Sequence, residues 1–412
     1  MDKIELPPGW KVVKLGEIAQ FKNGINFKKE QKGSGILTVD VLNMYSESLF
    51  ISMNRLYRVN IQLKDDYLLQ KNDILFVRSS LKQEGVGWAA LFSEFAEPVT
   101  FCGFIIRARL ETQEIEPIFL VNYLRLDTVR KILISKSGKV GVTNISQASL
   151  QSLPIIIPPL PEQKSIAHTL RTIQKAKETR QRELELERER KAALMEYLFT
   201  HGTRNEARKQ TEIGEIPESW EVVKLGKIAC IDMGQSPSGD TYNNTGVGKP
   251  LLNGPAEFGL EYPTPVQWTN KPTKICQIGD ILFCVRGNTT GKMNIADQEY
   301  CIGRGIAAIR GEKSYSNTLF IKYLLQYNIS QIYRIALSGG STFPNIGSRQ
   351  LKDYPVMYIN QAEQKEIAHI LKSCDTKIQA LEKEISLTDE LFHATLEELM
   401  TGKLSTKNLI AQ

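Results

Sequence analysis

The sequence "LPEQKSIAHTL", which begins at Leu160, returns as "QAEQKEIAHIL", which begins at Gln361. Both copies share the pattern Glu-Gln-Lys-x-Ile-Ala-His-x-Leu, and Glu162 and Glu363 lie 201 residues apart (363 − 162). Identity at so many positions over a fixed distance indicates an internal repeat, and a repeat of this size decides how the rest of the chain is interpreted.

The repeat extends over the whole sequence. "LPPGWKVVKLGEIA" (6–19) returns as "IPESWEVVKLGKIA" (216–229), and "KNDILFVRSS" (71–80) returns as "IGDILFCVRGN" (278–288). Each copy therefore consists of a globular part followed by a long helix. The predicted segments are a first globular domain, a central helix, a second globular domain and a distal helix, at 1–157, 158–205, 206–358 and 359–412.

The globular parts are predicted to be of mixed α and β structure. Apolar runs such as "DILFVR" (73–78) and "FCGFIIRARL" (101–110) predict strands, and "PIFLVNYLRLDTVRKIL" (117–133) and "NTLFIKYLLQYNISQIY" (317–333) predict helices. Between the repeated segments the copies differ, because "SSLKQEGVGWAALFSEF" faces "GNTTGKMNIADQEYCIG". A shared scaffold with different loops is typical of two copies of one fold that bind two different ligands.

The long helices carry an apolar seam. No Gly or Pro interrupts residues 162–199, and Gly202 is expected to end the first helix. Steps of three and four predict coiled-coil positions, with Thr388 and Thr395 as interruptions. In the two copies these positions are Ile166, Leu170, Ile173, Leu184, Leu194 and Leu198, and Ile367, Leu371, Cys374, Ile378, Leu381, Ile385, Phe392 and Leu399.

Charged residues replace the seam in the middle of the first helix, at Lys177, Arg180 and Glu187. We interpret this stretch as a solvated, salt-bridged helix face and not as a DNA-binding surface. An apolar stripe must be buried, and the other helix is the expected partner. We expect two antiparallel helices of about 57 Å related by a pseudo-twofold axis, with one α+β domain at each end.

Composition limits the class of protein. The chain is 42% hydrophobic and 24% charged, with a net charge of +6, as in an ordinary globular protein that has room for two or more domains. The N-terminus has no signal-peptide pattern, and no apolar run is long enough to span a membrane. A cytoplasmic protein with no membrane partner is predicted. The six cysteines form no CxxC pair, so no metal site is expected: Cys102, Cys230, Cys276, Cys284, Cys301 and Cys374.

The sequence contains no catalytic constellation that we can support. "GNTTGKM" (287–293) is one residue shorter than a phosphate loop and lacks the Ser or Thr that holds Mg²⁺. Asp353, Glu363 and Lys365 have the residue types of a nuclease site, but Ser152 stands where the first copy would need the aspartate. His168 and His369 begin the helices and are interpreted as structural. We predict that the chain is not an enzyme.

On these motifs, the chain resembles the specificity subunit of type I restriction–modification systems. The resemblance rests on the entry segments "PPGWKVVKLGEI" and "PESWEVVKLGKI" and the exit segments "LPIIIPPLPEQKSIAHTL" and "YPVMYINQAEQKEIAHIL", and it covers essentially the whole sequence. The second exit departs from the family pattern because it reads "YINQAEQ" in place of "PPLPEQ".

The resemblance implies a non-catalytic DNA-recognition subunit. Each globular part would be a target-recognition domain that reads one half of a bipartite double-stranded DNA site. The helices would set the spacing of the half-sites and dock two modification subunits that methylate adenine. Restriction subunits would join the complex. This chain would bind no cofactor, because S-adenosylmethionine, ATP and Mg would belong to the partner subunits.

Loop residues able to donate hydrogen bonds near Gly-rich segments are the candidates for DNA contact. In the first domain they are Arg78, Ser79, Ser80, Lys82, Gln83, Lys136, Lys139, Thr143 and Asn144. In the second domain they are Arg286, Asn288, Thr289, Lys292, Ser341, Thr342 and Asn345. Any of them is also explained as a solvated loop residue. Arg107 and Arg109 flank a strand and are equally explained as outward-facing charges.

Two other classes of function remain. A self-sufficient nuclease or methyltransferase would bind S-adenosylmethionine or cut DNA by itself, and we expect neither. A duplicated coiled-coil scaffold could join two partners without reading DNA. Binding to DNA that depends steeply on salt and prefers one duplex sequence would favour recognition, and sequence-blind binding would favour the scaffold.

Overall fold

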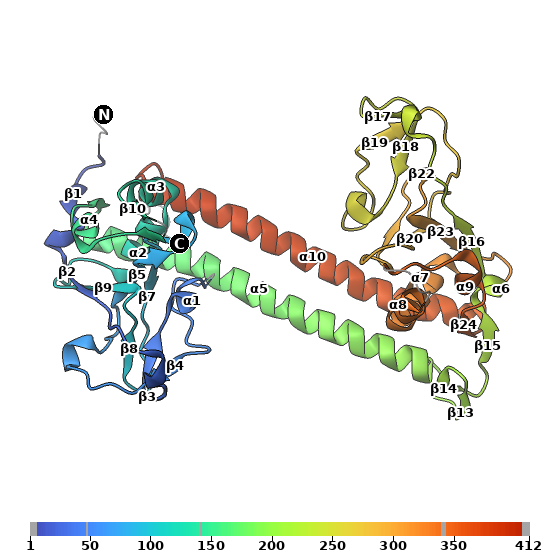
Figure 1. Ribbon diagram of the computed structural model, residues 1–412, viewed down its shortest axis with the longest axis horizontal. Coiled ribbons are helices and arrows are strands. Elements are labelled where there is room, and N and C mark those ends of the chain that lie inside the picture. Colours follow the sequence, from blue (N-terminus) through green and yellow to red (C-terminus); the bar gives the residue numbers. More distant parts are fainter. Residues whose placement is uncertain (1–5, 47, 141, 339–342, 406–412) are drawn as a thin grey trace. The chain divides into compact units, whose positions relative to one another are not determined.

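The computed structural model describes residues 6–46, 48–140, 142–338 and 343–405. The chain folds as two compact units. Unit 1 comprises Met1–Gln181 and Lys383–Gln412, and unit 2 comprises Arg182–Glu382. Each unit thus contains one globular part, the start of one long helix and the end of the other (Figure 1).

Unit 1 is built on a four-stranded antiparallel sheet in the order β2-β9-β5-β7. Its strands are Ala19–Asn23, Ile105–Leu110, Ile74–Val77 and Ala89–Leu91. A second sheet has the order β4-β3-β8, with strands Tyr57–Val59, Lys32–Val39 and Val99–Phe101. Two small sheets complete the unit: β1 (Lys11–Lys14) with β12 (Pro154–Ile157), and β10 (Gly138–Val140) with β11 (Val142–Asn144) and β6 (Ser79–Ser80).

Unit 2 repeats this plan. Its main sheet has the order β16-β23-β20-β21, with strands Ala229–Met233, Ile306–Gly311, Ile281–Cys284 and Met293–Ile295. Its second sheet has the order β17-β19-β18-β22, with strands Tyr242–Asn243, Gln267–Thr269, Lys249–Leu252 and Cys301–Ile302. β15 (Glu221–Lys224) pairs with β24 (Pro355–Tyr358), and a hairpin of β13 (Arg208–Thr211) and β14 (Gly214–Pro217) precedes them. The mixed α and β class is confirmed.

The last three helices of each globular part occur at equivalent places, whereas the first follows β3 in unit 1 and β15 in unit 2. Unit 1 has α1 (Val41–Met44), α2 (Pro117–Arg125), α3 (Asp127–Ser135) and α4 (Gln147–Gln151). Unit 2 has α6 (Leu225–Ile228), α7 (Thr318–Tyr327), α8 (Ile329–Leu337) and α9 (Ser348–Lys352). Each predicted helix of about 17 residues is therefore two helices. In the first copy the break falls at Leu126, whose extended backbone (ψ 138°) cannot continue a helix.

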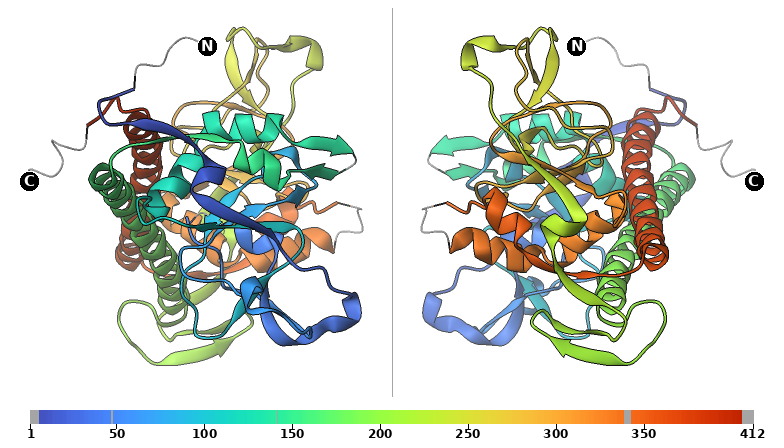
Figure 2. Two further views of the ribbon diagram at one scale, coloured as in Figure 1. Left: turned by 90° about the vertical axis from the view of Figure 1, so that its left-hand side faces the viewer. Right: turned by 90° about the vertical axis from the view of Figure 1, so that its right-hand side faces the viewer.

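The long helices are α5 (Leu160–His201) and α10 (Gln361–Met400). Within each unit the start of one and the end of the other lie side by side and antiparallel (Figures 1 and 2). In unit 1, Lys177 contacts Asp389 at 2.5 Å and Arg180, further along α5, contacts Glu384 at 2.9 Å, nearer the start of α10. All predicted seam positions are buried or half-buried, so the seam is confirmed.

The charged middle of α5 is salt-bridged, as predicted, but it is not simply solvated. Lys377 of α10 lies 3.2 Å from Glu183 and 3.6 Å from Glu187 in unit 2. The Glu187 side chain is only 5% exposed. Charged side chains therefore take the place of apolar ones between the two helices, since each finds an opposite charge on the facing helix.

The repeated glutamine of each Glu-Gln-Lys motif is a buried clamp. Gln364 is fully buried, and its amide nitrogen donates to the carbonyl oxygens of Ile359 (2.8 Å) and Tyr315 (2.9 Å). Its amide oxygen accepts the N–H of Asn317 at 3.0 Å. Gln163 makes the same three hydrogen bonds in unit 1, with Pro158, Glu114 and Glu116. One side chain thus joins the start of the long helix to the segment that leads into α2 or α7.

A buried ion pair is also repeated. Arg109 on β9 donates to both carboxylate oxygens of Asp73, at 2.8 and 2.7 Å, and Arg310 on β23 does the same to Asp280, at 2.7 and 2.9 Å. Hydrogen bonds to Asp280 raise the pKa of the Arg310 guanidinium. Arg107 is fully buried and donates to the carbonyl oxygen of Asp66 at 2.7 Å. The interpretation of Arg107 and Arg109 as outward-facing charges is therefore wrong.

The end of each long helix closes the core of the unit that it reaches. Leu396, Leu399 and Met400 of α10 are buried in the core of unit 1 together with Ile166 and Leu170 of α5. In unit 2, Leu198 and Phe199 of α5 pack with Ile367 and Leu371 of α10. Each helix then stops at a glycine in the left-handed region, as predicted for Gly202 (φ 67°) and repeated at Gly402 (φ 71°).

These end glycines lie against the repeated tryptophans. A Cβ atom on Gly202 would come within 3.0 Å of Cζ2 of Trp220, and one on Gly402 within 3.5 Å of Cζ2 of Trp10. Trp10 also donates from its indole nitrogen to Glu162 at 3.1 Å. The tryptophan, the start of one helix and the end of the other therefore meet at one corner of each unit.

Loss of the glutamine clamp should destabilise one unit. Gln364→Ala leaves a buried N–H and two buried carbonyl groups without their partner, and we expect a loss of about 2–4 kcal/mol. Hydrogen exchange of the full chain should show faster exchange throughout unit 2, with unit 1 much less affected. The control is Gln361→Ala, which removes a side chain that is exposed and makes one 3.2 Å bond to Lys313. Equal effects of the two substitutions would contradict the clamp.

Candidate nucleic-acid interface

In unit 1, the candidate residues meet where strand β5 ends. The N–H of Arg78 donates to the carbonyl oxygen of Phe104 at 2.7 Å, and the carbonyl oxygen of Arg78 accepts the N–H of Ile145 at 2.9 Å. The Arg78 guanidinium donates to the carbonyl oxygen of Gly103 at 3.3 Å. The main chain at Arg78 is thus fixed from both sides, and the next residues start the small sheet β10-β11-β6.

That small sheet joins the two predicted loops. Ser79 pairs with Asn144, and Ser80 pairs with Thr143. The Ser79 hydroxyl donates to the amide oxygen of Asn144. Thr143 is buried, whereas Asn144 is exposed. In the left view of Figure 2 the β10–β11 ribbon projects from the body of unit 1.

The remaining candidates of unit 1 are less tightly grouped. Lys82 is exposed and Gln83 half-buried, both on the turn after β6. Lys136, after α3, donates to the hydroxyl and carbonyl oxygens of Ser152 at 3.0 and 3.3 Å. The Lys139 side chain lies outside the described part of the structure. A hollow of about 420 Å³ adjoins the group and is lined by Asn23, Arg78, Asn144, Ile145, Ser146, Gln147 and Ala148.

In unit 2, strand β20 ends in the same way. Val285 donates its N–H to Gly305 at 2.9 Å and accepts that of Ile346 at 3.0 Å. Arg286 then forms an antiparallel bridge with Asn345, and its Nε donates to the amide oxygen of Asn345 at 3.1 Å. The structure therefore brings together Arg286 and Asn345, as it does Ser79 and Asn144.

The other candidates of unit 2 follow Arg286 along the chain. Asn288 and Lys292 are exposed, and the Thr289 hydroxyl lies 3.4 Å from the Cys284 sulfur. The carbonyl oxygen of Lys292 accepts the N–H of Cys284 at 2.9 Å, so this turn folds back on the end of β20. Ser341 and Thr342 lie outside the described residues.

The hydrogen bonds define which residues of the two units are equivalent. Arg78 corresponds to Val285, because both make the same two main-chain bonds. The equivalent of Arg286 is therefore Ser79, although the sequence places an arginine in both loops. By the same criterion Phe104, which is 59% exposed, corresponds to Gly305. Phe104 was not among the residues predicted from the sequence. The sequence does contain a sign of it, because an aromatic residue ends "CGF" (102–104) where the second copy has "RG" (304–305).

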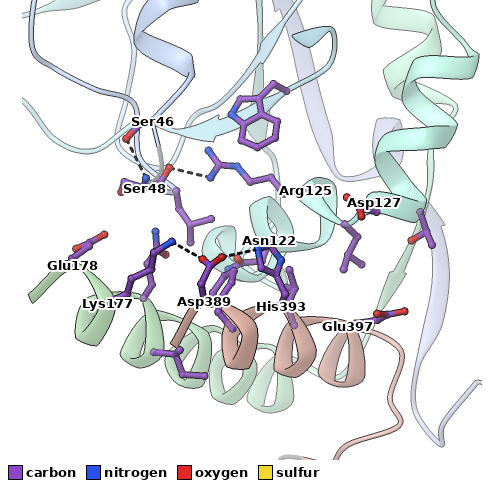
Figure 3. A pocket seen from close by; sticks show the side chains of 18 of the residues that line it. Ser46, Ser48, Asn122, Arg125, Asp127, Lys177, Glu178, Asp389, His393 and Glu397 are labelled. Atoms are coloured by element: carbon purple, nitrogen blue, oxygen red, sulfur yellow. Dashed lines mark hydrogen bonds and ion pairs between the residues drawn. The ribbon is translucent and has the colours of Figure 1, made fainter. Parts of the chain in front are cut away.

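A larger cavity of about 930 Å³ lies in unit 1, between the globular part and the long helices (Figure 3). Ser48, Arg125 and Trp88 line one side, and Lys177, Asp389 and His393 line the other. The Arg125 guanidinium donates to the carbonyl oxygens of Ala89 and Ser48. Burial, together with the charge of Arg130, lowers the pKa of Arg125 to about 10.

Two residues that line this cavity have equivalents in unit 2, 201 residues later, that bond to each other. Gln174, in the wall of the cavity, corresponds to Asp375, and Asn122 corresponds to Tyr323. Asp375 accepts from Lys191 at 2.6 Å and from the Tyr323 hydroxyl at 2.7 Å. Burial would raise the pKa of Asp375, but these hydrogen bonds and the nearby lysines bring it below the usual value. At these two positions unit 2 thus has side chains that bond to each other, where unit 1 has residues that line a cavity.

Two of the residues considered for a nuclease site make structural contacts. Asp353 pairs with Lys224 at 2.9 Å, while Glu363 is buried and accepts the N–H of Thr203 at 3.0 Å. Within the described part of the chain, no group of three or more His, Cys, Asp or Glu residues is placed to hold a metal ion. His168 and His369 are both exposed on their helices.

Comparison with known proteins assigns the family. A family model described as "Type I restriction modification DNA specificity domain" matches the chain twice, over residues 7–188 and 217–388. The chain is 35% identical over 413 residues to the protein assigned as the MjaX specificity subunit of a type I restriction enzyme in Methanocaldococcus jannaschii. That match covers 98% of this chain and 95% of the relative. The chain belongs to the type I restriction–modification DNA specificity family.

A second curated relative and a solved structure are also similar to the specificity chain. The MjaVIII specificity subunit of a type I restriction enzyme from the same organism is 25% identical, over 99% of this chain and 96% of its own length. The solved S subunit of a type I restriction–modification system from M. genitalium has a TM-score of 0.63 at 17% identity, with 97% of each chain covered. At that identity the structural match concerns the fold alone. In the described residues, no helix of the specificity chain is long and apolar enough to cross a membrane.

If the loop after β6 contacts the DNA backbone, Lys82→Ala should weaken binding to all duplex sequences alike. Removal of one phosphate contact should reduce the slope of log affinity against log salt by about one. Equilibrium binding of the full chain at several salt concentrations measures this slope. The control is Lys71→Ala, because Lys71 precedes β5, at the end opposite Arg78, and pairs with Glu94. A Lys82 variant that binds like wild type would remove this loop from the interface.

Proposed function

We propose that the specificity chain recognises a bipartite DNA site, and that the α/β part of each unit reads one half of it. The observation that carries the proposal is a contrast within each unit. The buried contacts are the same in both units, whereas the exposed residues after one strand differ. The buried framework is repeated, with the same Gln clamp and the same Asp–Arg pair. The exposed residues at the end of the equivalent strands β5 and β20 differ.

This contrast is what two readers of different sequences require. Phosphate contacts position a protein on DNA but carry no sequence information, which comes from side chains at the edges of the bases. A fixed main chain with variable side chains allows one fold to present different groups to two half-sites. The clamp and the ion pair hold that main chain, because they bond the elements on which the reading residues stand.

We further propose that α5 and α10 set the distance between the half-sites. α5 is a continuous helix of 42 residues and α10 one of 40 residues, and each contributes to the cores of both units. A helix has a fixed rise of about 1.5 Å per residue, so its length determines spacing more firmly than a loop would.

In this proposal the chain supplies specificity and its partners supply the chemistry. Two modification subunits that bind S-adenosylmethionine would dock on the helices and methylate an adenine. The adenine amino group lies within a stacked base pair, so the partner must turn the base out of the duplex while the flanking bases are held. Restriction subunits with ATP and Mg would complete the assembly.

The modular assignment can be tested by exchange. Replacing residues 20–150 by the same region of a relative should change one half of the recognised sequence and leave the other half unchanged. This exchange retains Trp10 and Gln163, which hold the unit to the helices. Mapping of methylated adenines in cells that carry the exchanged chain provides the measurement. A change in both halves, or in neither, would refute one reader per unit.

The spacing assignment can be tested by lengthening the helices. Seven residues inserted after Gln181 in α5 and after Glu382 in α10 fall where the two compact units divide. A heptad keeps the seam in register and adds about 10.5 Å, which is about three base pairs of DNA. Methylation mapping should show a longer gap between two unchanged half-sites. An unchanged gap would show that the helices do not determine it.

A further inference from the structure

The two units differ in the residue that directly follows the last residue of the fixed main chain at the end of β5 and β20. In both units this residue pairs with an asparagine. In unit 1, Ser79 stands opposite Asn144, and in unit 2, Arg286 stands opposite Asn345. The main chain leading to each is fixed by the same two hydrogen bonds, to Phe104 or Gly305 and to Ile145 or Ile346. The difference therefore lies in the side chains and not in the path of the backbone.

Arg286 is exposed, but its orientation is restricted. Its Nε donates to the amide oxygen of Asn345 at 3.1 Å, and the described residues give its side chain no other hydrogen bond or ion pair. The turn after Arg286 is also fixed, because the N–H of Gly287 donates to Pro344 at 2.8 Å. With Nε occupied, the two terminal nitrogens remain as a planar pair of donors.

A planar pair of donors matches one base better than the others. In the major groove, guanine offers two adjacent acceptors, O6 and N7, to which arginine binds with two hydrogen bonds. Holding the guanidinium in place before binding lowers the entropy lost on contact, which strengthens that recognition. A serine at the equivalent position has a short hydroxyl that donates once, and so it cannot make this bidentate contact.

We propose that Arg286, oriented by Asn345, reads a guanine in the half-site bound by unit 2. Ser79 imposes no such requirement on the equivalent base of the other half-site. This inference rests on the proposed function, because it names a base within the sequence that unit 2 recognises. It also assigns Asn345 as a positioning residue, which acts on the base through Arg286.

The experiment selects bound sequences from a pool of randomised duplexes with the full chain and sequences them. Wild type should select a bipartite site with an invariant guanine in one half. Arg286→Ala should reduce the preference for that guanine by about tenfold or more and leave the other positions unchanged. Arg286→Lys keeps the charge but not the planar pair, and should bind the pool with near wild-type affinity while losing most of the preference.

Two further variants separate positioning from contact. Asn345→Ala should weaken the preference at the same base, by less than Arg286→Ala does. Ser79→Ala, the matched control in unit 1, should leave that base unaffected. If Arg286→Ala keeps the full preference, or loses affinity for all sequences equally, as expected for a phosphate contact, the inference is overturned. If wild type selects no sequence, the proposed function itself fails.

Discussion

The structure depends on one kind of contact between the two long helices. The last turns of each helix are buried in the core that contains the first turns of the other. Leu399 of α10 packs with Leu170 of α5 in unit 1, and Leu198 of α5 packs with Leu371 of α10 in unit 2. Neither core consists only of residues from one copy of the repeat. Burial of such apolar side chains contributes roughly 1.5–3 kcal/mol each, so each copy gains much of its stability from residues of the other.

The buried polar groups determine the arrangement of the fold and add little to its stability. Gln163 and Gln364 add little net energy when bonded, but a misplaced helix would leave their partners unsatisfied in the interior. The same holds for the carboxylates of Asp73 and Asp280 with their arginines. Apolar burial therefore favours compaction, and these few directed bonds determine which arrangement is adopted. This explains why they are identical in both copies while the exposed loops differ.

Much of the fold followed from the sequence because it depends on periodicity. The repeat, the seam and the glycine that ends the first helix are read from spacing alone, and each was confirmed. The reason for the repeated glutamine was not accessible, since two of its three partners lie 47 and 49 residues earlier in the chain. The same limit applies to Arg107, whose burial depends on a contact with a loop that no local pattern predicts.

At the candidate interface, the equivalence of residues follows from the sequence but their side-chain contacts do not. The sequence selected the right kinds of residue, and the structure brought Ser79 to Asn144 and Arg286 to Asn345. The shared "DILF" aligns Ser79 with Arg286, as it does Asp73 with Asp280, so the two arginines differ by one residue in the register of the strand. A shift of one residue along a strand reverses the direction of the side chain. The main-chain hydrogen bonds at Arg78 and Val285 agree with this register.

The shared cores also bear on the origin of the molecule. A polypeptide with a single copy would lack the helix end that covers its own apolar surface, but two identical polypeptides could each cover the other. Such a homodimer would read a palindrome, with the same bases in both halves. Fusion of two genes into one chain would free the halves to diverge, and an asymmetric site would become possible without any change in the buried framework.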